Sequence, residues 1–280
     1  MSAEIIKCKK IASDIRKETD ELRDIYGINN FKIVVFLLSS DEASGFYAEN
    51  IRKDGEKRGF HVDIIHSDPE NFSNAFAQAN EDDDISGIMV QFPIPKKYPV
   101  KDILKTIKPE KDIDGIGFLS VASLYYKERC LNPSTAEAVI EILKRGCNVD
   151  IGEGITVVGR SNIVGLPLFH LLLHENFTPT ICHSKTHNLK SITSKSKVLI
   201  SAIGKPNFFD DTYILQNSIL IDVGTNFYKG KWVGDFDFEK CTDKAAYITK
   251  VPSGVGSVTR SILYRNMIKS IIWQMENRHG

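Results

Sequence analysis

Apolar side chains along the chain follow two alternating patterns, short unbroken runs and helical spacing. Residues 31–38 (FKIVVFLL) form a nearly continuous apolar run rich in β-branched side chains, typical of a strand buried on both faces of a parallel sheet. Residues 4–26 carry apolar side chains at helical spacing with charges between them, which indicates an amphipathic helix. Strand-like runs alternate with helical segments through most of the chain, and this alternation predicts βαβ units.

The pattern predicts two successive series of elements. In the first, strands are expected at 31–38, 62–66 and 85–91, and helices at 4–26, 45–58, 72–82, 100–107 and 134–145. In the second, strands are expected at 155–158, 177–182, 198–203, 219–223 and 246–249, and helices at 166–174 and 257–276. Residues 146–154 lie between the two series and look like a boundary. We therefore expect an α/β protein of two domains, each a mostly parallel sheet with flanking helices.

Composition and charge narrow the class of protein. The length of 280 residues suits two domains of about 150 residues each, and a hydrophobic content of 42% argues against a disordered chain. Thirty-six basic residues balance thirty-six acidic ones, whereas proteins that coat nucleic acid or anionic membrane usually carry a basic excess. The longest apolar runs are about strand length, so no membrane span is expected. The first residues lack the features of a signal or transit peptide, and a cytoplasmic location is expected.

The cysteines indicate neither a disulfide framework nor a zinc ribbon. They are odd in number, scattered and without C-x-x-C spacing, which favours a reducing compartment and no metal site. They are Cys8, Cys130, Cys147, Cys182 and Cys241.

The segment after the strand at 155–158 has the glycines of a nucleotide-binding turn. Gly159 and Gly165 would let the chain turn tightly and approach a pyrophosphate at a helix N-terminus. The spacing departs from G-x-G-x-x-G, and glycines at both ends of a βα loop are also ordinary turn chemistry. The next strand ends in CHSKT (182–186), without the acidic residue that binds the ribose of NAD. Because Arg160 and the donors of that segment suit a 2′-phosphate, the sequence favours NADP over NAD.

Five motifs resemble those of methylenetetrahydrofolate dehydrogenase/methenyltetrahydrofolate cyclohydrolase proteins, and they occur in the family's order. They are VQFPIP (90–95), KDIDG (111–115), GRSNIVGLP (159–167), CHSKTH (182–187) and VPSGVGSVT (251–259). The resemblance covers essentially the whole chain. It implies a folate-binding catalytic domain of residues 1–146, completed by the C-terminal helix 257–280, and a Rossmann-like NADP-binding domain of residues 147–256. It also implies a folate substrate, NADP-dependent oxidation of 5,10-methylenetetrahydrofolate, and a homodimer.

The resemblance further implies roles for individual residues. Tyr47 would stack on or position the pterin and its one-carbon bridge, while Gln91 and Asp114 would line the folate pocket, with Asp114 pairing with the pterin. Arg160 and Ser184 would hold the 2′-phosphate. The other expected site residues are Pro252 and Gly254 for the folate, and Gly159, Ser161, Gly165, His183, Thr225 and Thr259 for the cofactor.

Each catalytic candidate also has a purely structural interpretation. Gln91 could cap a turn, and Asp112 and Asp114 could be turn formers in front of Gly115. Tyr47, considered alone on an amphipathic helix, is more often a packing residue. The joint appearance of the motifs favours the functional interpretation.

The chain departs from the family at a position that matters for chemistry. The family carries Tyr-x-x-x-Lys, and that lysine is the proton shuttle of the cyclohydrolase step. Here Tyr47 is followed four residues later by Ile51, and Ser44 and Gly59 align with the family without a gap. An aliphatic side chain can neither donate nor accept a proton.

The neighbouring basic residues do not replace the lysine. Helix geometry rotates Arg52 by about 140° and Lys53 by about 120° from Tyr47, so neither lies on the face of the tyrosine. Arginine also stays protonated at any working pH. Hydride transfer depends mainly on positioning, whereas hydrolysis requires proton transfer. We therefore expect dehydrogenase activity to be retained and cyclohydrolase activity to be reduced or absent.

Other departures leave alternatives open. The family's Pro-Cys-Thr-Pro-x-Gly becomes PSTAEA (133–138), its Pro-Gly-Gly-Val-Gly-Pro becomes PSGVGS (252–257), and Thr225 replaces an aliphatic residue near the expected nicotinamide. One alternative is a bifunctional enzyme in which another group or a water chain replaces the lysine. The other is an inactive homologue that binds folate or dinucleotide.

Overall fold

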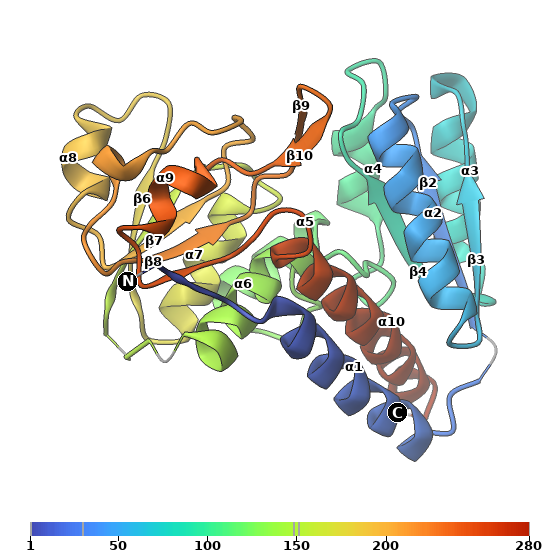
Figure 1. Ribbon diagram of the computed structural model, residues 1–280. Coiled ribbons are helices and arrows are strands. Elements are labelled where there is room, and N and C mark those ends of the chain that lie inside the picture. Colours follow the sequence, from blue (N-terminus) through green and yellow to red (C-terminus); the bar gives the residue numbers. More distant parts are fainter. Residues whose placement is uncertain (1, 30, 148, 151, 280) are drawn as a thin grey trace. The chain divides into compact units, whose positions relative to one another are not determined.

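The computed structural model describes residues 2–29, 31–147, 149–150 and 152–279, and residues 148 and 151 of the predicted boundary lie outside these ranges. The chain divides into two compact units, Met1–Ile15 with Thr135–Ile262, and Arg16–Ser134 with Leu263–Gly280. Each is built on a mostly parallel sheet with flanking helices, so the predicted α/β class is confirmed (Figure 1). This division differs from the expected one mainly at residues 1–15 and 135–146, which group with the later sheet.

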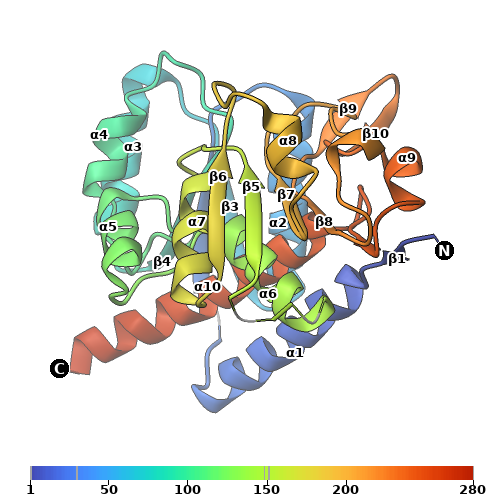
Figure 2. The ribbon, with the colours of Figure 1, turned by 90° about the vertical axis from the view of Figure 1, so that its left-hand side faces the viewer.

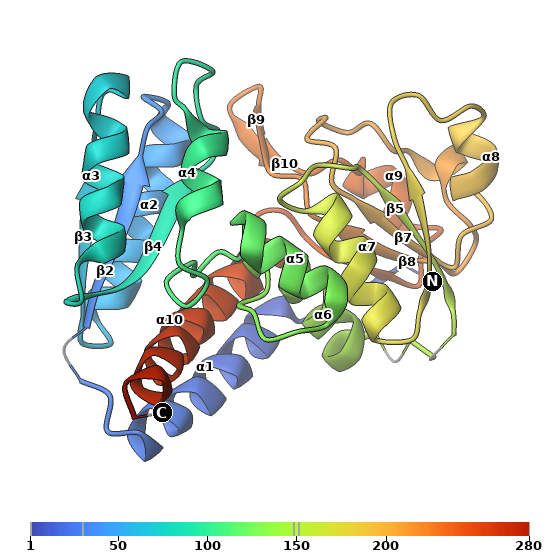
Figure 3. The ribbon, with the colours of Figure 1, turned by 180° about the vertical axis from the view of Figure 1, so that it is seen from behind.

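The unit of residues 16–134 and 263–280 contains a three-stranded parallel sheet in the order β3-β2-β4. Its elements are β2 (Phe31–Leu37), α2 (Glu42–Glu56), β3 (Phe60–Ile65), α3 (Pro69–Glu81), β4 (Ile85–Gln91), α4 (Val100–Thr106), α5 (Phe118–Tyr126), and parts of α1 (Cys8–Ile25) and α10 (Val255–His279). Along β2, Ile33 and Val35 join the core under α2 and α10, while Val34 and Phe36 join the core under α3 and α4. The prediction of a strand buried on both faces is therefore confirmed. Helix α5 packs beside α4 (Figure 3).

The other unit contains a six-stranded parallel sheet in the order β1-β11-β8-β7-β5-β6 (Figure 2). Its strands are β1 (Glu4–Ile5), β5 (Gly154–Val158), β6 (Thr178–Cys182), β7 (Val198–Ser201), β8 (Ile219–Asp222) and β11 (Tyr247–Ile248). Its remaining elements are α6 (Ser134–Gly146), α7 (Gly165–His174), α8 (Leu189–Thr193), the 3-10 helix Asp211–Tyr213, the hairpin β9 (Asn226–Tyr228) and β10 (Lys231–Val233), and α9 (Phe238–Thr242).

The strand order of this sheet reverses at β5. From β5 the chain passes through α7 to β6 on one side, and then through α8 to β7 on the other. In open α/β sheets, such a reversal opens a ligand crevice at the carboxyl ends of the two diverging strands. The strand topology therefore leads us to expect the crevice beyond Val158 and Ser201, as in a Rossmann-like unit.

Several elements differ from the sequence prediction. Residues 4–5 form a strand and not the start of a helix, because Glu4 and Ile5 pair in parallel with β11. Helix α5 lies where a loop was expected, and its short, almost wholly apolar sequence shows little helical periodicity. The hairpin β9–β10 was also missed, because its turn is Lys229-Gly230, both with positive φ, and not the more familiar Asn-Gly. In the part of the chain that the structure describes, no helix combines the length and apolarity needed to cross a membrane.

Candidate active site

Tyr47 and Gln91 belong to elements that share one face of the three-stranded sheet. Met89, two residues before Gln91 on β4, lies in the core cluster that α2 covers, and Tyr47 packs against the same cluster. Because strand side chains alternate between faces, Gln91 emerges on the α2 side as well. Gln91 is 8% exposed, and its Nε2 donates to the Phe92 carbonyl at 2.8 Å. Its buried Oε1 has no protein partner, as expected of an acceptor that awaits a ligand or water.

The turn that carries Asp114 is fixed against β4. Ile88 donates its N–H to Lys111 O at 2.7 Å and accepts from Ile113 N at 3.3 Å, so the chain runs beside the strand before turning. Gly115 has a φ of +64°, and a Cβ there would lie 2.1 Å from Leu131 O. Only glycine fits this turn without displacing the neighbouring backbone.

The two aspartates of this turn, Asp112 and Asp114, differ in their hydrogen bonding and burial. Asp112 is buried, and its Oδ2 accepts from Gly117 N at 2.7 Å and Ser120 Oγ at 2.6 Å, so it holds the start of α5. Burial raises the pKa of Asp112, although these donors oppose the rise. Asp114 is half-buried, and burial together with the charge of Asp112 raises its pKa to about 7, against an opposing effect of Ser134. The structural interpretation therefore applies to Asp112, while Asp114 keeps an ionisable carboxyl for other use.

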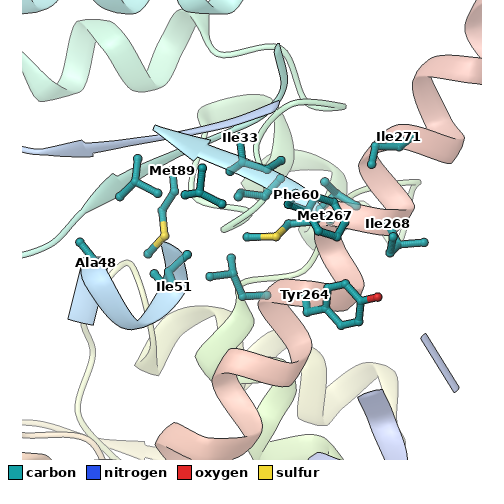
Figure 4. Close-up of a cluster of buried hydrophobic side chains, with 14 of the residues drawn as sticks. Ile33, Ala48, Ile51, Phe60, Met89, Tyr264, Met267, Ile268 and Ile271 are labelled. Atoms are coloured by element: carbon teal, nitrogen blue, oxygen red, sulfur yellow. The ribbon is translucent and has the colours of Figure 1, made fainter. Parts of the chain in front are cut away.

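Ile51 occupies the position of the family lysine and belongs to the core. It is 3% exposed and lies on α2 beside Met89 and one turn from Ala48 (Figure 4). Ile51 lies in a cluster made mostly of aliphatic side chains, and its own side chain has no proton to exchange.

The basic residues considered as replacements for the lysine, Arg52 and Lys53, form ion pairs with glutamates on α2, and Lys111 bonds to backbone carbonyls. Arg52 donates to Glu49 at 2.9 Å through Nε and to Glu56 at 2.5 Å through Nη1, and these bonds raise the pKa of the guanidinium. Lys53 lies on the exposed side of α2, with its Nζ 3.8 Å from Glu49. Lys111 donates from Nζ to the backbone carbonyls of Asn80 and Asp82 at 2.9 and 2.6 Å, at the end of α3.

The predicted nucleotide loop brings backbone segments so close together that its two glycines, Gly159 and Gly165, leave no room for a Cβ. A Cβ on Gly165 would lie 2.1 Å from Gly159 O, and one on Gly159 would lie 2.5 Å from Ala202 O. Ser161 Oγ accepts from Val164 N at 3.2 Å and Gly165 N at 3.4 Å, which caps the start of α7. The loop is therefore a backbone cradle at a helix N-terminus, and this fits the pyrophosphate of a dinucleotide.

Arg160 and Ser184 leave the sheet from adjacent strands. Val158 and Cys182 are register partners, and Gly159 N donates to Cys182 O at 2.9 Å, so the two loops begin side by side. His183 and Thr186 close the second loop, with His183 N donating to Thr186 Oγ1 at 2.8 Å. Arg160, Ser184 and Lys185 are exposed. These exposed donors, without an acidic residue among them, fit a 2′-phosphate.

The remaining predicted residues lie on two further segments of the same unit. Thr225 is exposed in the loop after β8. Pro252 is exposed, Gly254 is buried with room for no Cβ because Lys250 O would lie 2.5 Å from it, and Thr259 is buried with its hydroxyl donating to Val255 O. The expected folate residues thus belong to both units, with Tyr47, Gln91 and Asp114 in one and Pro252 and Gly254 in the other.

Sequence reasoning missed several buried polar residues that shape these loops. Asn266 donates from Nδ2 to Ile113 O at 3.0 Å and to Asn132 O at 2.9 Å, and so fixes the turn of Asp114. An asparagine within the apolar face of the last helix was the available signal. Asp222 and Asp235 are buried near the carboxyl ends of β7 and β8. Over the described ranges, no group of three or more His, Cys, Asp or Glu residues could hold a metal ion.

Sequence models of one protein family match most of the chain, including residues of both units. The sequence model of the tetrahydrofolate dehydrogenase/cyclohydrolase catalytic domain matches residues 6–114, and that of the corresponding NAD(P)-binding domain matches residues 133–275. Bifunctional protein FolD of Clostridium novyi is 41% identical over 273 residues, which cover 94% of this chain and 97% of the relative.

Solved structures show the same fold along the whole chain. The bifunctional enzyme FolD of Campylobacter jejuni has a TM-score of 0.90 at 31% identity, covering 98% of this chain and 100% of the other. The Trypanosoma brucei FolD complexed with NADP cofactor and inhibitor has a TM-score of 0.86 at 30% identity, covering 98% and 99%.

Proposed function

Because the chain belongs to the tetrahydrofolate dehydrogenase/cyclohydrolase family, we propose that it oxidises 5,10-methylenetetrahydrofolate with NADP⁺ and has reduced or no cyclohydrolase activity. The first part is supported by relatives that are dehydrogenases of this substrate and by the nucleotide cradle between Gly159 and Gly165. The second part rests on a single observation, the buried Ile51 in the place of the family lysine.

The dehydrogenase step depends on positioning by residues that the chain retains. Tyr47 and Gln91 emerge on one face of the sheet, and we assign to them the placement of the pterin and its one-carbon bridge. Asp114 pairs with the N–H groups of the pterin when its carboxyl is ionised. Gly159, Ser161 and Gly165 hold the pyrophosphate, and Arg160 and Ser184 the 2′-phosphate. When bound, NADP⁺ supplies the hydride acceptor.

The cyclohydrolase step requires a group that activates water. General acid–base catalysis contributes a factor of about 10²–10⁴, and Ile51 cannot supply it. The bifunctional alternative is supported by the relatives that are bifunctional FolD proteins, and it requires another base in place of the lysine. Asp114, whose pKa of about 7 suits that task, is the candidate.

A paired assay on the purified protein tests the proposal. Methylenetetrahydrofolate and NADP⁺ are supplied, and the methenyl product is followed as it forms and as it hydrolyses. Formation of methenyl product that then decays at the buffer rate is the expected result. Enzyme-accelerated decay would establish the bifunctional alternative, and no product with NADP⁺ or NAD⁺ would leave an inactive binding protein.

We also propose that the protein is a homodimer in the cytoplasm, as the family resemblance implies. Sedimentation equilibrium of the purified chain tests the oligomeric state. A mass of 31.4 kDa at all concentrations would contradict the dimer.

A further inference from the structure

Asp235 is a fully buried carboxylate that gathers hydrogen bonds from several loops. It lies between β10 and α9 and is 0% exposed. Its Oδ2 accepts from Ser201 Oγ at 2.7 Å, Ile203 N at 2.9 Å and Gly204 N at 3.2 Å, and its Oδ1 from Lys205 N at 2.8 Å and Asn226 Nδ2 at 3.2 Å.

The loop held by Asp235 lies at the switch point of the sheet, where the topology leads us to expect the cofactor crevice. Residues 202–205 follow β7 directly, and Ala202 N donates to Val158 O, the last residue of β5, at 2.9 Å. The same loop limits the nucleotide turn, because a Cβ on Gly159 would lie 2.5 Å from Ala202 O. A shift of this loop would therefore change the shape of the crevice that receives the cofactor.

The three consecutive N–H groups of residues 203–205 converge on one anion. Such backbone nests bind phosphate in many proteins, but here an internal carboxylate fills the nest. These N–H groups are consequently not available to the cofactor. The pyrophosphate is left to the turn of residues 159–165, and the loop after β7 serves as a fixed wall.

Asp222 accepts hydrogen bonds from the backbone of Asp235 and its neighbours and so holds this segment. Its Oδ1 accepts from Asp235 N and Gly224 N, both at 3.0 Å, and its Oδ2 from Phe236 N at 2.9 Å. The packing is close, since a Cβ on Gly224 would lie 2.2 Å from Asp235 Oδ1. Asp235 is therefore held through its own backbone N–H as well as through the loops that donate to its carboxylate.

We propose that Asp235 is a positioning residue for NADP binding, which sets the shape of the loop after β7 and of Asn226 without contacting the cofactor. The inference deepens the function proposed above and rests on its cofactor site, but not on its reaction. The proposal applies to NADP⁺ and NADPH alike, because the loop after β7 is shaped by bonds within the protein and not by the redox state of the cofactor.

The test is the isosteric substitution Asp235→Asn, which places an amide N–H against donors that need an acceptor. We expect the Kd of NADP⁺, measured by calorimetry, to rise about tenfold or more, since several bonds to a charged acceptor are lost together. In the assay, KM for NADP⁺ should rise equally while KM for the folate stays unchanged. The matched control is Asp237→Asn in the same segment, which removes a carboxylate charge but keeps an oxygen that can accept from Lys240 N at the start of α9, and it should leave both constants unaltered.

A merely structural role gives a different result. Asp235→Asn would then melt at a lower temperature but bind NADP⁺ with the wild-type Kd, and this would overturn the proposal. If Asp235→Asn does not fold, Ser201→Ala removes one of the five bonds, and a wild-type Kd for that variant would be equally contrary. Because calorimetry needs no turnover, these outcomes are distinct from a failure of the dehydrogenase assignment.

Discussion

Ile51 lies one helical turn beyond Tyr47 on α2, and the two side chains differ in burial: Tyr47 is half-buried and Ile51 is 3% exposed. The helix therefore presents the tyrosine at the margin of the apolar core and directs the following turn into it. A long cationic side chain at position 51 would bury its stem in that core and reach toward the tyrosine with its amine. Burial would also lower the pKa of that amine toward the range that a general base needs.

The substitution Ile51→Lys should therefore restore cyclohydrolase activity. We expect the rate of methenyl hydrolysis to increase by about 10²-fold or more, as a positioned acid–base group allows. The free energy of unfolding should fall by about 1–3 kcal/mol, because an amine replaces a buried aliphatic side chain. The measurement is the decay of the methenyl absorbance with purified variant, corrected for the buffer rate.

The control for this substitution is Ile51→Met, which is unbranched and flexible like lysine but has no amine. Its hydrolysis rate should equal that of the unaltered protein. Equal gains in both variants would trace the effect to altered packing, and no gain in Ile51→Lys would contradict the assignment of the loss to this position.

Arg160 should determine the preference for NADP over NAD. We expect Arg160→Ala to raise the KM for NADP⁺ by about 10–100-fold, because a hydrogen bond to a charged group is lost. NAD⁺ lacks the 2′-phosphate and is the internal control, so its KM should change little. The two constants are measured in the same assay, and a parallel rise in both would assign Arg160 to the shared part of the cofactor instead.

The glycines of the nucleotide turn should differ sharply from a nearby glycine with free space. A Cβ on Gly165 would lie 2.1 Å from Gly159 O, whereas a Cβ on Gly154 would meet nothing within 4 Å. Gly165→Ala should abolish measurable NADP⁺ binding and lower the melting temperature, because the turn must open to admit the methyl group. Gly154→Ala at the start of β5 is the matched control and should leave both unchanged. Calorimetry and thermal unfolding of the two variants decide the matter.

Much of the fold could be predicted from the sequence because strands buried on both faces consist of unbroken runs of apolar residues. The run at residues 31–38 predicted β2, and the two-sided burial of Val34 and Val35 confirms it. Helix α5 was missed because its short apolar sequence shows little helical periodicity, and because its first turn is held by the side chain of Asp112 just before the helix, a contact that the apolar pattern does not encode.

Some residues of the candidate site could likewise be identified from local sequence, and others could not. Gly159 and Gly165 could be identified from local spacing, since turn geometry is a local property. Asp235 could not, because its donors lie near residues 201–205 and 226, and only the folded sheet brings them together. Tyr47, Gln91 and Asp114 were suggested by the family resemblance and not by local pattern, because they lie on separate elements of the chain.

The raised pKa values of buried carboxyls should make stability fall with pH across the neutral range. The pKa values of Asp114 and Asp222 rise from 3.8 to about 7 in the folded protein. Between pH 3.8 and about pH 7, these two carboxyls hold protons in the folded state that they have already released in the unfolded chain. Their contribution to stability is therefore complete below about pH 4 and is lost as the pH rises through 7. Urea unfolding at pH 5 and pH 8 measures this difference. In Asp222→Asn, the decrease between the two pH values should be smaller, and an unchanged decrease would assign it to other groups.

The same raised pKa of Asp114 should govern folate affinity in the opposite direction. The ionised carboxyl accepts hydrogen bonds from pterin N–H groups, whereas the protonated form has lost half of that capacity. With a pKa of about 7, the ionised fraction rises about tenfold between pH 6 and pH 8, and the affinity for a non-reacting folate should rise with it. Asp114→Asn should bind more weakly and with no such dependence, while the Kd of NADP⁺ should serve as the pH control in both proteins. If Asp114→Asn keeps the pH dependence of the unaltered protein, the titrating group lies elsewhere and Asp114 does not pair with the pterin.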